Sequence, residues 1–231
     1  MVADNGSGDP ERDAHAWFPK ERLTMAQDSA RFLNVDGLSI RYWKSAGGDK
    51  PAIVFFHGWA FSLDNWLQIG TLEELAKGGY AVYAVDLPAG RGSKSSKIEY
   101  KKAADLVPTI EKILSGLGVG SSSVVLVGPS MGGGFALAYA LAHPERISAL
   151  VLISPALHLV QDEDLSSLEV PVLLVWGEND SVFPLDEVGR PLKDELLHSK
   201  LIILKEAGHA AYLDKPSEFN ELLLEFLEEA L

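Results

Sequence analysis

A serine in a short glycine-flanked turn is the residue of this sequence whose surroundings most clearly indicate chemistry. Ser130 lies at the centre of G-P-S-M-G (128–132), which matches the pattern G-x-S-x-G. A β-branched apolar run at 124–127 precedes this pentapeptide, and an Ala- and Leu-rich helical run follows it. A strand, a tight turn with a central serine and a helix form the context in which the pattern indicates a nucleophile. Since a serine hydroxyl is a weak nucleophile at neutral pH, Ser130 requires a general base and a carboxylate that orients the base.

Histidine is the natural general base because its pKa lies near the working pH. Of the six histidines, His209 is the predicted base, because it lies among small residues in E-A-G-H-A-A (206–211), after the last expected strand. His158, in an irregular segment, is the alternative base. The other four fall in a polar tail, a loop after a strand, a helix end and a surface connection; they are His15, His57, His143 and His198.

Asp180 is the predicted carboxylate partner of the base. It ends the sequence G-E-N-D (177–180), which follows an expected strand at 170–176 directly. The order Ser130, Asp180, His209 along the chain is the order expected for a nucleophile of this type. Glu178 is the alternative acid, and an aspartate that only caps a turn is the alternative interpretation of Asp180.

A tetrahedral intermediate would require two N–H donors aimed at its oxyanion. Met131 N–H, at the start of the helix after the nucleophile, is one predicted donor. Trp59 N–H, in the H-G-W loop that follows an expected strand at 52–56, is the other. His57 is expected to shape this loop through hydrogen bonds and, with Phe61 and Trp66, to lie around an acyl pocket. For each aromatic residue, ordinary core packing is an equally good interpretation.

Apolar runs alternate with helical segments along the chain and predict an α/β fold with a mostly parallel, doubly wound sheet. The expected strands are 52–56, 80–85, 124–127, 149–153, 170–176 and 201–204, after a hairpin of 30–35 and 38–43 around Asp36-Gly37. The expected helices are 72–77, 101–115, 131–142, 184–197 and 216–231; Pro108 either begins or kinks the second. His57, Asp86, Ser130, Ser154 and Asp180 each follow a strand, at the sheet edge where ligands bind.

Length and composition favour one domain with a small-molecule substrate. The 231 residues are divided into an expected disordered extension at 1–24 and a single domain at 25–231. The net charge of −13 argues against nucleic acid as a partner, and no apolar run is long enough to span a membrane. The absence of cysteine excludes disulfides and thiolate metal sites. We expect no cofactor and no metal, a cytoplasmic location, and a monomer or small homo-oligomer.

Several short motifs together resemble those of the α/β-hydrolase superfamily over about residues 30–231. They are H-G-W (57–59), D-L-P (86–88), G-P-S-M-G (128–132), G-E-N-D (177–180) and A-G-H (207–209). H-G-W-A-F-S-L-D-N-W and A-G-H-A-A-Y-L-D-K-P resemble the small α/β-hydrolase-domain family 14 type. The resemblance implies a serine hydrolase of short acyl esters with Ser130, Asp180 and His209 as its triad. Two residues depart from the usual pattern, Arg91 in D-L-P-A-G-R-G-S and Pro129 before the serine.

Many members of this superfamily carry a helical cap after the strand that corresponds to 149–153. The 15 residues from Pro155 to Glu169 are too few for such a cap, so we expect an open site for small acyl groups. Carboxylesterase-like hydrolysis is the leading hypothesis. Transfer of the acyl group to an acceptor other than water would use the same triad, and a non-catalytic binding protein of the same fold is the alternative from another class.

Overall fold

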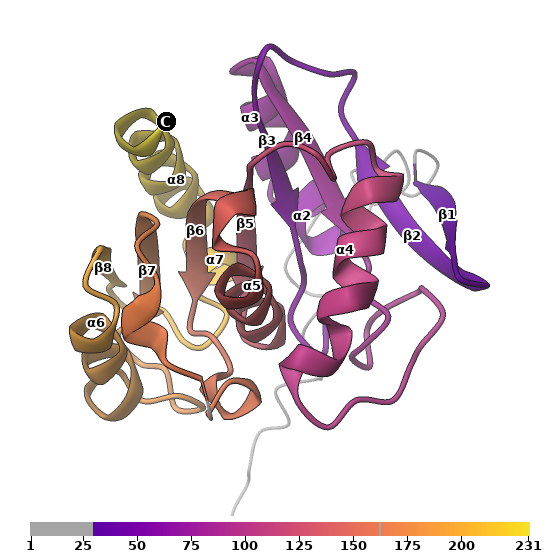
Figure 1. The fold of residues 1–231 in the computed structure, drawn as a ribbon. Helices are drawn as coiled ribbons and strands as arrows, with labels where there is room; N and C mark the ends of the chain where they lie inside the picture. The colour runs from indigo at the N-terminus through magenta and orange to yellow at the C-terminus, as the bar shows by residue number, and fades with distance from the viewer. Residues whose placement is uncertain (1–29, 162) are drawn as a thin grey trace, which may run out of the picture.

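The computed structural model describes residues 30–161 and 163–231, which contain an eight-stranded sheet with the order β1-β2-β4-β3-β5-β6-β7-β8 (Figure 1). The strands are β1 (Arg31–Val35), β2 (Leu38–Lys44), β3 (Lys50–Phe55), β4 (Tyr80–Val85), β5 (Val124–Pro129), β6 (Ile147–Ile153), β7 (Val172–Gly177) and β8 (Ser199–Leu204). Strands β3 to β8 are parallel, whereas β1 and β2 are antiparallel. The α/β fold with a mostly parallel sheet is therefore confirmed. The extension expected at 1–24 lies outside the described residues.

The expected N-terminal hairpin is present and forms one edge of the sheet. β1 and β2 pair antiparallel, and Asp36 and Gly37 between them have φ angles of +50° and +85°. Positive φ at both central residues is the requirement of a tight hairpin turn, which Asp-Gly satisfies at low cost. The side chain of Asn34 accepts a hydrogen bond from Gly37 N–H (3.1 Å) and closes the turn. The hairpin brings β2 alongside β4.

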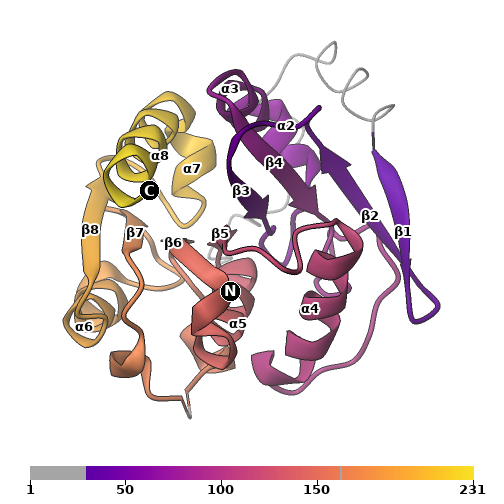
Figure 2. The ribbon, with the colours of Figure 1, turned by 45° about the horizontal axis from the view of Figure 1, so that its top comes forward.

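Helices cover both faces of the sheet, as the views from two directions show (Figures 1 and 2). They are α2 (Asp64–Gln68), α3 (Thr71–Lys77), α4 (Val107–Gly116), α5 (Met131–Ala142), α6 (Arg190–Glu195), α7 (Ala211–Asp214) and α8 (Pro216–Ala230). Helices α4, α5 and α6 pack into one apolar core, and α2, α3, α7 and α8 pack into a second core on the other face.

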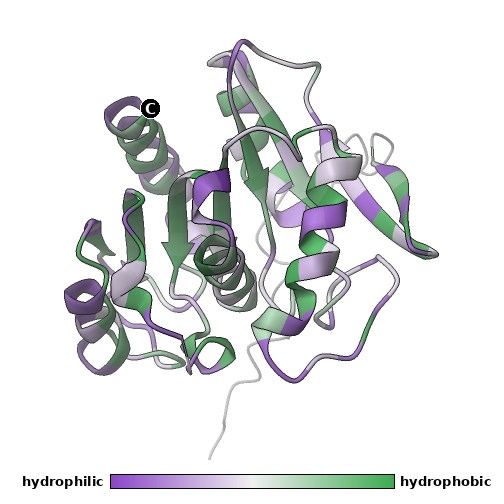
Figure 3. Ribbon diagram, viewed as in Figure 1, coloured by the Kyte–Doolittle hydropathy of each residue, from purple (hydrophilic) through white to green (hydrophobic). Residues whose placement is uncertain are grey.

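Successive residues of the central strand β5 supply both cores in turn. Val124 and Leu126 pack with α4 and α5, whereas Val125 and Val127 pack on the opposite face. Side chains alternate between the two faces of a strand, and a strand buried on both faces must therefore be apolar throughout. Figure 3 shows the central strands and α5 in the colour of hydrophobic residues, whereas α4 and α8 contain both hydrophobic and hydrophilic residues.

Four helical segments refine or differ from the sequence-based expectation. Pro108 is the second residue of α4, which follows a 3₁₀ turn (Ala103–Leu106), so the proline begins the helix and does not kink it. The helix expected at 184–197 consists of a π-helical turn (Leu185–Gly189) followed by the short α6. Helices α2 and α7, of five and four residues, were not predicted.

The connection between β6 and β7 contains no cap, as expected. Its described residues form only two short 3₁₀ turns, Leu157–Leu159 and Leu165–Ser167. The sheet edge beyond β5 and β6 therefore carries loops and no additional helical layer over the described part of the chain. In that same part, none of the helices is both long and apolar enough to cross a membrane.

Trp66 and Trp59 allow a direct test of the packing. Trp66 is 0% exposed and its ring lies 4.4 Å from that of Tyr212, whereas Trp59 is 51% exposed. We expect Trp66→Ala to lower the free energy of unfolding by about 3–5 kcal/mol, because it leaves a large cavity. Trp59→Ala should lower it by less than about 1 kcal/mol. Urea denaturation followed by circular dichroism measures both, and equal losses would contradict the assignment of Trp66 to the core.

Candidate active site

The backbone of Ser130 is strained and firmly held. Ser130 lies between the end of β5 and the start of α5, with φ +48° and ψ −117°. A non-glycine residue in such a conformation costs of order 1–3 kcal/mol and persists only where its surroundings impose it. Ser130 N–H donates to the carbonyl of Ile153 (2.8 Å), and its own carbonyl accepts from Gly134 (3.0 Å) and Ala156 (2.9 Å). These bonds fix the half-buried serine between β6 and α5.

The glycines that flank the serine are required by close backbone packing. A Cβ added at Gly128 would lie 2.5 Å from the carbonyl carbon of Gly132. A Cβ added at Gly132 would lie 2.6 Å from the carbonyl oxygen of His57. No side chain fits at either position without movement of the backbone. The strand, the helix and the loop after β3 therefore meet around Ser130.

Asp180 and His209 form a hydrogen-bonded pair at the same edge of the sheet. His209 Nδ1 lies 2.9 Å from Asp180 Oδ2, and Asp180 Oδ1 accepts from the N–H groups of Val182 and Phe183 (both 2.9 Å). Burial alone would raise the pKa of Asp180, but the hydrogen bonds from His209 and Phe183 hold it below its usual value. Because an ionised carboxylate can only accept, the proton is on Nδ1 and Nε2 remains available as a base.

The ends of three strands bring the serine and this pair to one edge. Ser130 follows β5, Asp180 follows β7 and His209 follows β8. At Gly177, the last residue of β7, a Cβ would collide with the backbone of Gly208, so the two loops of the pair are in direct contact. No hydrogen bond joins Ser130 Oγ to His209 among the described residues.

Glu178 and His158, the alternative acid and base, lie outside the Asp180–His209 pair. Glu178 accepts a hydrogen bond from Glu206 N–H (3.1 Å) and joins the ends of β7 and β8 at the surface. The ring centroids of His158 and Phe183 are 6.4 Å apart. Phe183 in turn contacts His209 edge-on, with 5.1 Å between their ring centroids. Within 30–161 and 163–231, neither Glu178 nor His158 forms an acid–histidine pair. The structure brings together Asp180 and His209 instead.

The two N–H groups predicted as oxyanion donors, those of Met131 and Trp59, belong to segments that adjoin Ser130. Met131 is the first residue of α5, so its N–H has no acceptor within the helix. Trp59 N–H has no acceptor among the residues that the structure describes. The loop containing Trp59 lies against the serine, because a Cβ added at the preceding Gly58 would be 3.8 Å from Ser130 Cβ.

His57 holds the Trp59 loop and does not line a pocket. Its Nε2 accepts a hydrogen bond from Leu87 N–H (3.0 Å), so Nδ1 carries the proton and donates to the carbonyl of Gly58 (2.7 Å). Burial lowers the pKa of His57, which favours this neutral form. The side chain is fully buried and links the loops after β3 and β4. The expectation that it lies in a substrate pocket is therefore corrected.

Trp66 does not lie in the predicted acyl pocket either. It belongs to α2, is completely buried in the core, and its Nε1 donates to the carbonyl of Phe56 (2.8 Å). Core packing, the alternative interpretation of this residue, is the correct one. Phe61 is half-buried and lies close enough to Gly58 that a Cβ there would be 3.2 Å from its ring. Phe61 thus remains adjacent to the serine.

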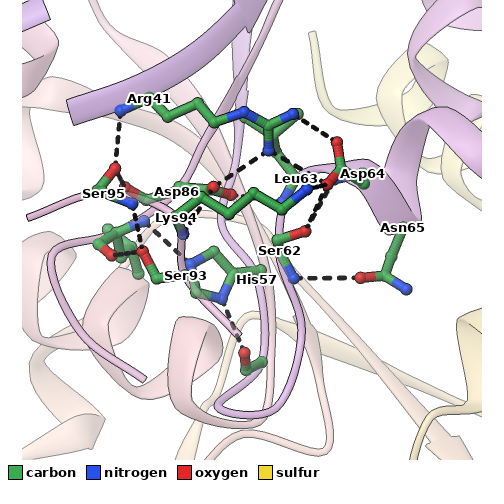
Figure 4. A network of polar contacts seen from close by, with 12 residues as sticks. Arg41, His57, Ser62, Leu63, Asp64, Asn65, Asp86, Ser93, Lys94 and Ser95 are labelled. Atoms are coloured by element: carbon green, nitrogen blue, oxygen red, sulfur yellow. Dashed lines mark hydrogen bonds and ion pairs between the residues drawn. The ribbon is translucent and has the colours of Figure 1, made fainter. Parts of the chain in front are cut away.

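A buried charge network supports the same loops and was not predicted from the sequence (Figure 4). The Arg41 guanidinium contacts Asp64 (2.6 Å) and Asp86 (3.2 Å), and Lys94 Nζ contacts Asp64 (2.6 Å). Asp86 also accepts from the backbone N–H groups of Leu63 (2.6 Å) and Lys94 (3.1 Å). Burial would raise the pKa of Asp64, but Arg41 and Lys94 hold it below its usual value. The network joins β2, α2 and the loop after β4.

The described residues offer no obvious place for a metal ion. Among residues 30–161 and 163–231, no group of three or more His, Cys, Asp or Glu side chains is arranged to hold one. A recess of about 280 Å³ opens beside His158, between Leu165 and Glu195, at the surface. The arrangement at the sheet edge can support nucleophilic chemistry with a serine, a histidine paired with a carboxylate, and two N–H donors.

Comparison with known sequences identifies related proteins. A family model described as "alpha/beta hydrolase fold" matches residues 51–170. The mouse protein named ABHD14A is 34% identical over 180 residues, which are 78% of this chain and 71% of that protein. A rat protein named "Putative protein-lysine deacylase ABHD14B" is 29% identical over 204 residues, which are 85% of this chain and 94% of that protein.

Solved structures show the same fold. A Thermoplasma acidophilum protein described as a "predicted CIB-like hydrolase" is 28% identical with a TM-score of 0.78, covering 87% of this chain and 97% of that chain. The carboxylesterase CesB from Bacillus subtilis is 19% identical with a TM-score of 0.75, covering 92% and 98% respectively. At this identity the second likeness concerns the fold alone.

The neutral, buried His57 predicts a pH dependence of stability. Its pKa is lowered in the folded protein and is about 6.5 in an unfolded chain, so below that pH the unfolded chain binds a proton that the folded protein excludes. The free energy of unfolding should therefore fall below about pH 6.5, with a slope of up to about 1.4 kcal/mol per pH unit from this residue.

Urea unfolding between pH 5.5 and 7.5 measures this slope. His57→Gln should lose the His57 part of the slope, while His198→Gln, at an exposed position, should keep the wild-type slope. An unchanged slope in His57→Gln would contradict a buried neutral imidazole.

Proposed function

Because this chain belongs to the α/β-hydrolase fold family, and within it resembles the ABHD14 type, we propose that it is a serine hydrolase with Ser130 as its nucleophile. His209 is the general base and Asp180 its carboxylate partner. One observation carries the proposal: the strained Ser130 lies at the helix N-terminus on the same sheet edge as the hydrogen-bonded Asp180–His209 pair. A serine held in this way presents its hydroxyl outward above the sheet.

The reaction begins when His209 Nε2 removes the proton of Ser130 Oγ as this oxygen attacks the acyl carbonyl carbon. The carbonyl oxygen becomes an oxyanion, which the N–H groups of Trp59 and Met131 stabilise. Each such donor is worth about 2.7–4 kcal/mol in kcat. His209 then gives its proton to the leaving group, and an acyl-enzyme remains.

Water completes the cycle through the same residues. His209 removes a proton from the water as it attacks the acyl carbon, and the proton passes to Ser130 Oγ as the acid is released. Asp180 stabilises the imidazolium that forms in both halves of the reaction. Its lowered pKa keeps the carboxylate ionised for this role. The bonds from Val182 and Phe183 keep the other carboxylate oxygen fixed.

The open approach to Ser130 favours small acyl groups. The connection after β6 has only short 3₁₀ turns where a cap would stand, and Ser130 itself is half-buried. An uncovered site offers little apolar surface along a long acyl chain, and binding energy from the chain would be correspondingly small. Short-chain esters are therefore the substrates proposed.

Removal of an acyl group from an amine is the second candidate. It is favoured by the relative named as a protein-lysine deacylase, which this chain matches over 94% of that protein. The same triad would serve, with His209 protonating the leaving amine and with water or another nucleophile accepting the acyl group. Parallel assays with short-chain esters and with acylated lysine peptides, with and without a thiol acceptor, distinguish ester hydrolysis, amide cleavage and transfer.

Fluorophosphonate labelling tests the nucleophile. We expect the wild-type protein to be labelled and Ser130→Ala to be unlabelled, with a loss of at least about 1,000-fold in kcat for any ester that is turned over. Ser166→Ala, at an exposed serine of the connection after β6, is the matched control and should be labelled normally. Labelling that survives Ser130→Ala would identify another serine, and a folded wild type that is never labelled would favour a non-catalytic binding protein.

The uncovered site also predicts a preference in acyl length. The kcat/KM values for p-nitrophenyl acetate and butyrate should equal or exceed those for the corresponding laurate and palmitate, because the long chains gain little burial. Steady-state kinetics below the critical micelle concentration of each ester provide the comparison. Higher kcat/KM values for the long chains would overturn the proposal of small acyl substrates.

A further inference from the structure

Ser154, the first residue after β6, is a buried serine in a strained backbone conformation. Its φ angle is +41°, and it has no exposed surface. In the described part of the chain, the other non-glycine residues with positive φ are Asp36, Ser130 and Glu206. The hairpin turn explains Asp36, but no such turn accounts for Ser154. A conformation of this kind persists only where the surrounding structure imposes it, and it is concentrated at functional sites.

The backbone of Ser154 is fixed between the proposed nucleophile and its acid. Ser154 N–H donates to the carbonyl of Val175 on β7 (3.1 Å), and the preceding carbonyl, that of Ile153, accepts from Ser130 N–H (2.8 Å). The sheet has the order β5-β6-β7 at this point. The end of β6 therefore lies between the strand that leads to Ser130 and the strand that leads to Asp180.

The hydroxyl of Ser154 is a buried polar group without a partner of ordinary geometry. Its Oγ is inaccessible to solvent and forms no hydrogen bond within residues 30–161 and 163–231. A buried donor left unpaired costs free energy, so its presence in a folded protein requires an explanation. A hydroxyl can rotate to suit a nearby acceptor. The strained backbone thus holds a spare donor at the sheet edge that contains the site.

The Asp180 carboxylate has room for this donor. Oδ1 accepts from the N–H groups of Val182 and Phe183, whereas Oδ2 is bonded to His209 alone among the described residues. A carboxylate oxygen can accept two hydrogen bonds. Burial would raise the pKa of Asp180; His209 and Phe183 lower it through their hydrogen bonds, and the Ser154 hydroxyl acts in the same direction. The hydroxyl is therefore close to the carboxylate.

We propose that Ser154 is a positioning residue that donates its hydroxyl proton to a hydrogen bond with the Asp180 carboxylate, beside His209. Ser154 keeps its proton throughout the reaction and acts through Asp180, not on the substrate. The bond spreads the negative charge of the carboxylate, so protonation of the adjacent imidazole becomes less favourable. The neutral base then persists to lower pH. This inference rests on the proposed serine-hydrolase function and adds a residue to its acid–base machinery.

The charges around the imidazole make Asp180 the group through which such an effect must act. The titratable residues on the surrounding loops and on α7 are His158, Glu178, Asp180, Glu206, Asp214 and Lys215. Phe183 lies between His158 and His209 and contacts both rings. Glu206 pairs with Lys215 (3.1 Å), and Asp214 accepts from the N–H of the residue before His209 (2.7 Å). Asp180 is the titratable group bonded to the imidazole itself.

Removal of the hydroxyl tests the inference. Ser154→Ala deletes the hydroxyl alone, whereas Ser154→Gly deletes it and also relieves the positive φ. In both variants the acid limb of kcat/KM against pH should move to higher pH by about 0.5 unit, because Asp180 then stabilises the imidazolium more strongly. The plateau of kcat/KM should fall about threefold to tenfold, the effect of one hydrogen bond. Hydrolysis of p-nitrophenyl acetate, followed at a wavelength where its product absorbs equally at all pH values, measures both.

Ser199→Ala is the matched control for loss of a serine hydroxyl. Ser199 Oγ donates to the carbonyl of Leu196 (2.6 Å) at the amino end of β8, the end opposite His209. This variant should keep the wild-type acid limb and plateau. An unmoved acid limb in both Ser154 variants would overturn the inference. A shift in only one of them would also overturn it, because the loss of the hydroxyl is what the two changes share.

Proton NMR separates this inference from a failure of the catalytic proposal. The proton between His209 Nδ1 and Asp180 gives a low-field resonance without turnover, and His209→Gln identifies it by its loss. In Ser130→Ala protein, the added change Ser154→Ala should move this resonance to lower field, because Asp180 loses a competing donor and accepts more strongly from the imidazole. An unmoved resonance would overturn the role of Ser154 even if esters are hydrolysed. Fluorophosphonate labelling of Ser130 decides the catalytic proposal separately.

Discussion

The carboxylate of Asp86, which has no exposed surface, imposes a condition on the side of the molecule that contains the Trp59 loop. A buried charge is tolerated only where partners surround it, and removal of one partner of a buried pair typically costs 3–5 kcal/mol. The partners of Asp86 come from separate elements: Arg41 on β2, Leu63 before α2 and Lys94 in the loop after β4. Satisfying this one group therefore fixes the antiparallel hairpin, the short helix α2 and the loops around Ser130 relative to one another.

Asp180 is a second buried carboxylate, on the other side of the serine. It too is buried, and its two oxygens are divided between backbone N–H groups and the imidazole of His209. The difference lies in the partner. Asp86 is surrounded by the Arg41 guanidinium and by two backbone N–H groups, and it holds loops together. Asp180 has a histidine as its partner, and imidazole is the side chain that acid–base chemistry at neutral pH most often uses. Asp86 and Asp180 are thus both buried carboxylates with satisfied oxygens, but only Asp180 is paired with a histidine.

Local sequence was sufficient for the features that depend on local forces. The parallel strands were predicted because strands buried on both faces need continuous apolar runs, and the Ser130 turn because glycines accompany it on both sides. Helices α2 and α7 escaped prediction because helices this short depend on tertiary packing. The aromatic character of Trp66 did not reveal which face of the fold it occupies. The pairing of Arg41 with acids 23 and 45 residues away left no sign in the sequence.

The distribution of Ser130, Asp180 and His209 over the ends of β5, β7 and β8 also bears on how the chain folds. Parallel pairing between distant segments raises contact order and slows folding, because loops must close before the contacts that stabilise them exist. The left-handed backbone of Ser130 is held by bonds to Ile153 and Ala156, which require β6 to be in place. A partly folded chain could therefore contain native helices and hairpin while the Ser130 turn is not yet formed. The activity proposed for Ser130 would then appear only after β6 has paired, and its recovery would report formation of this part of the sheet.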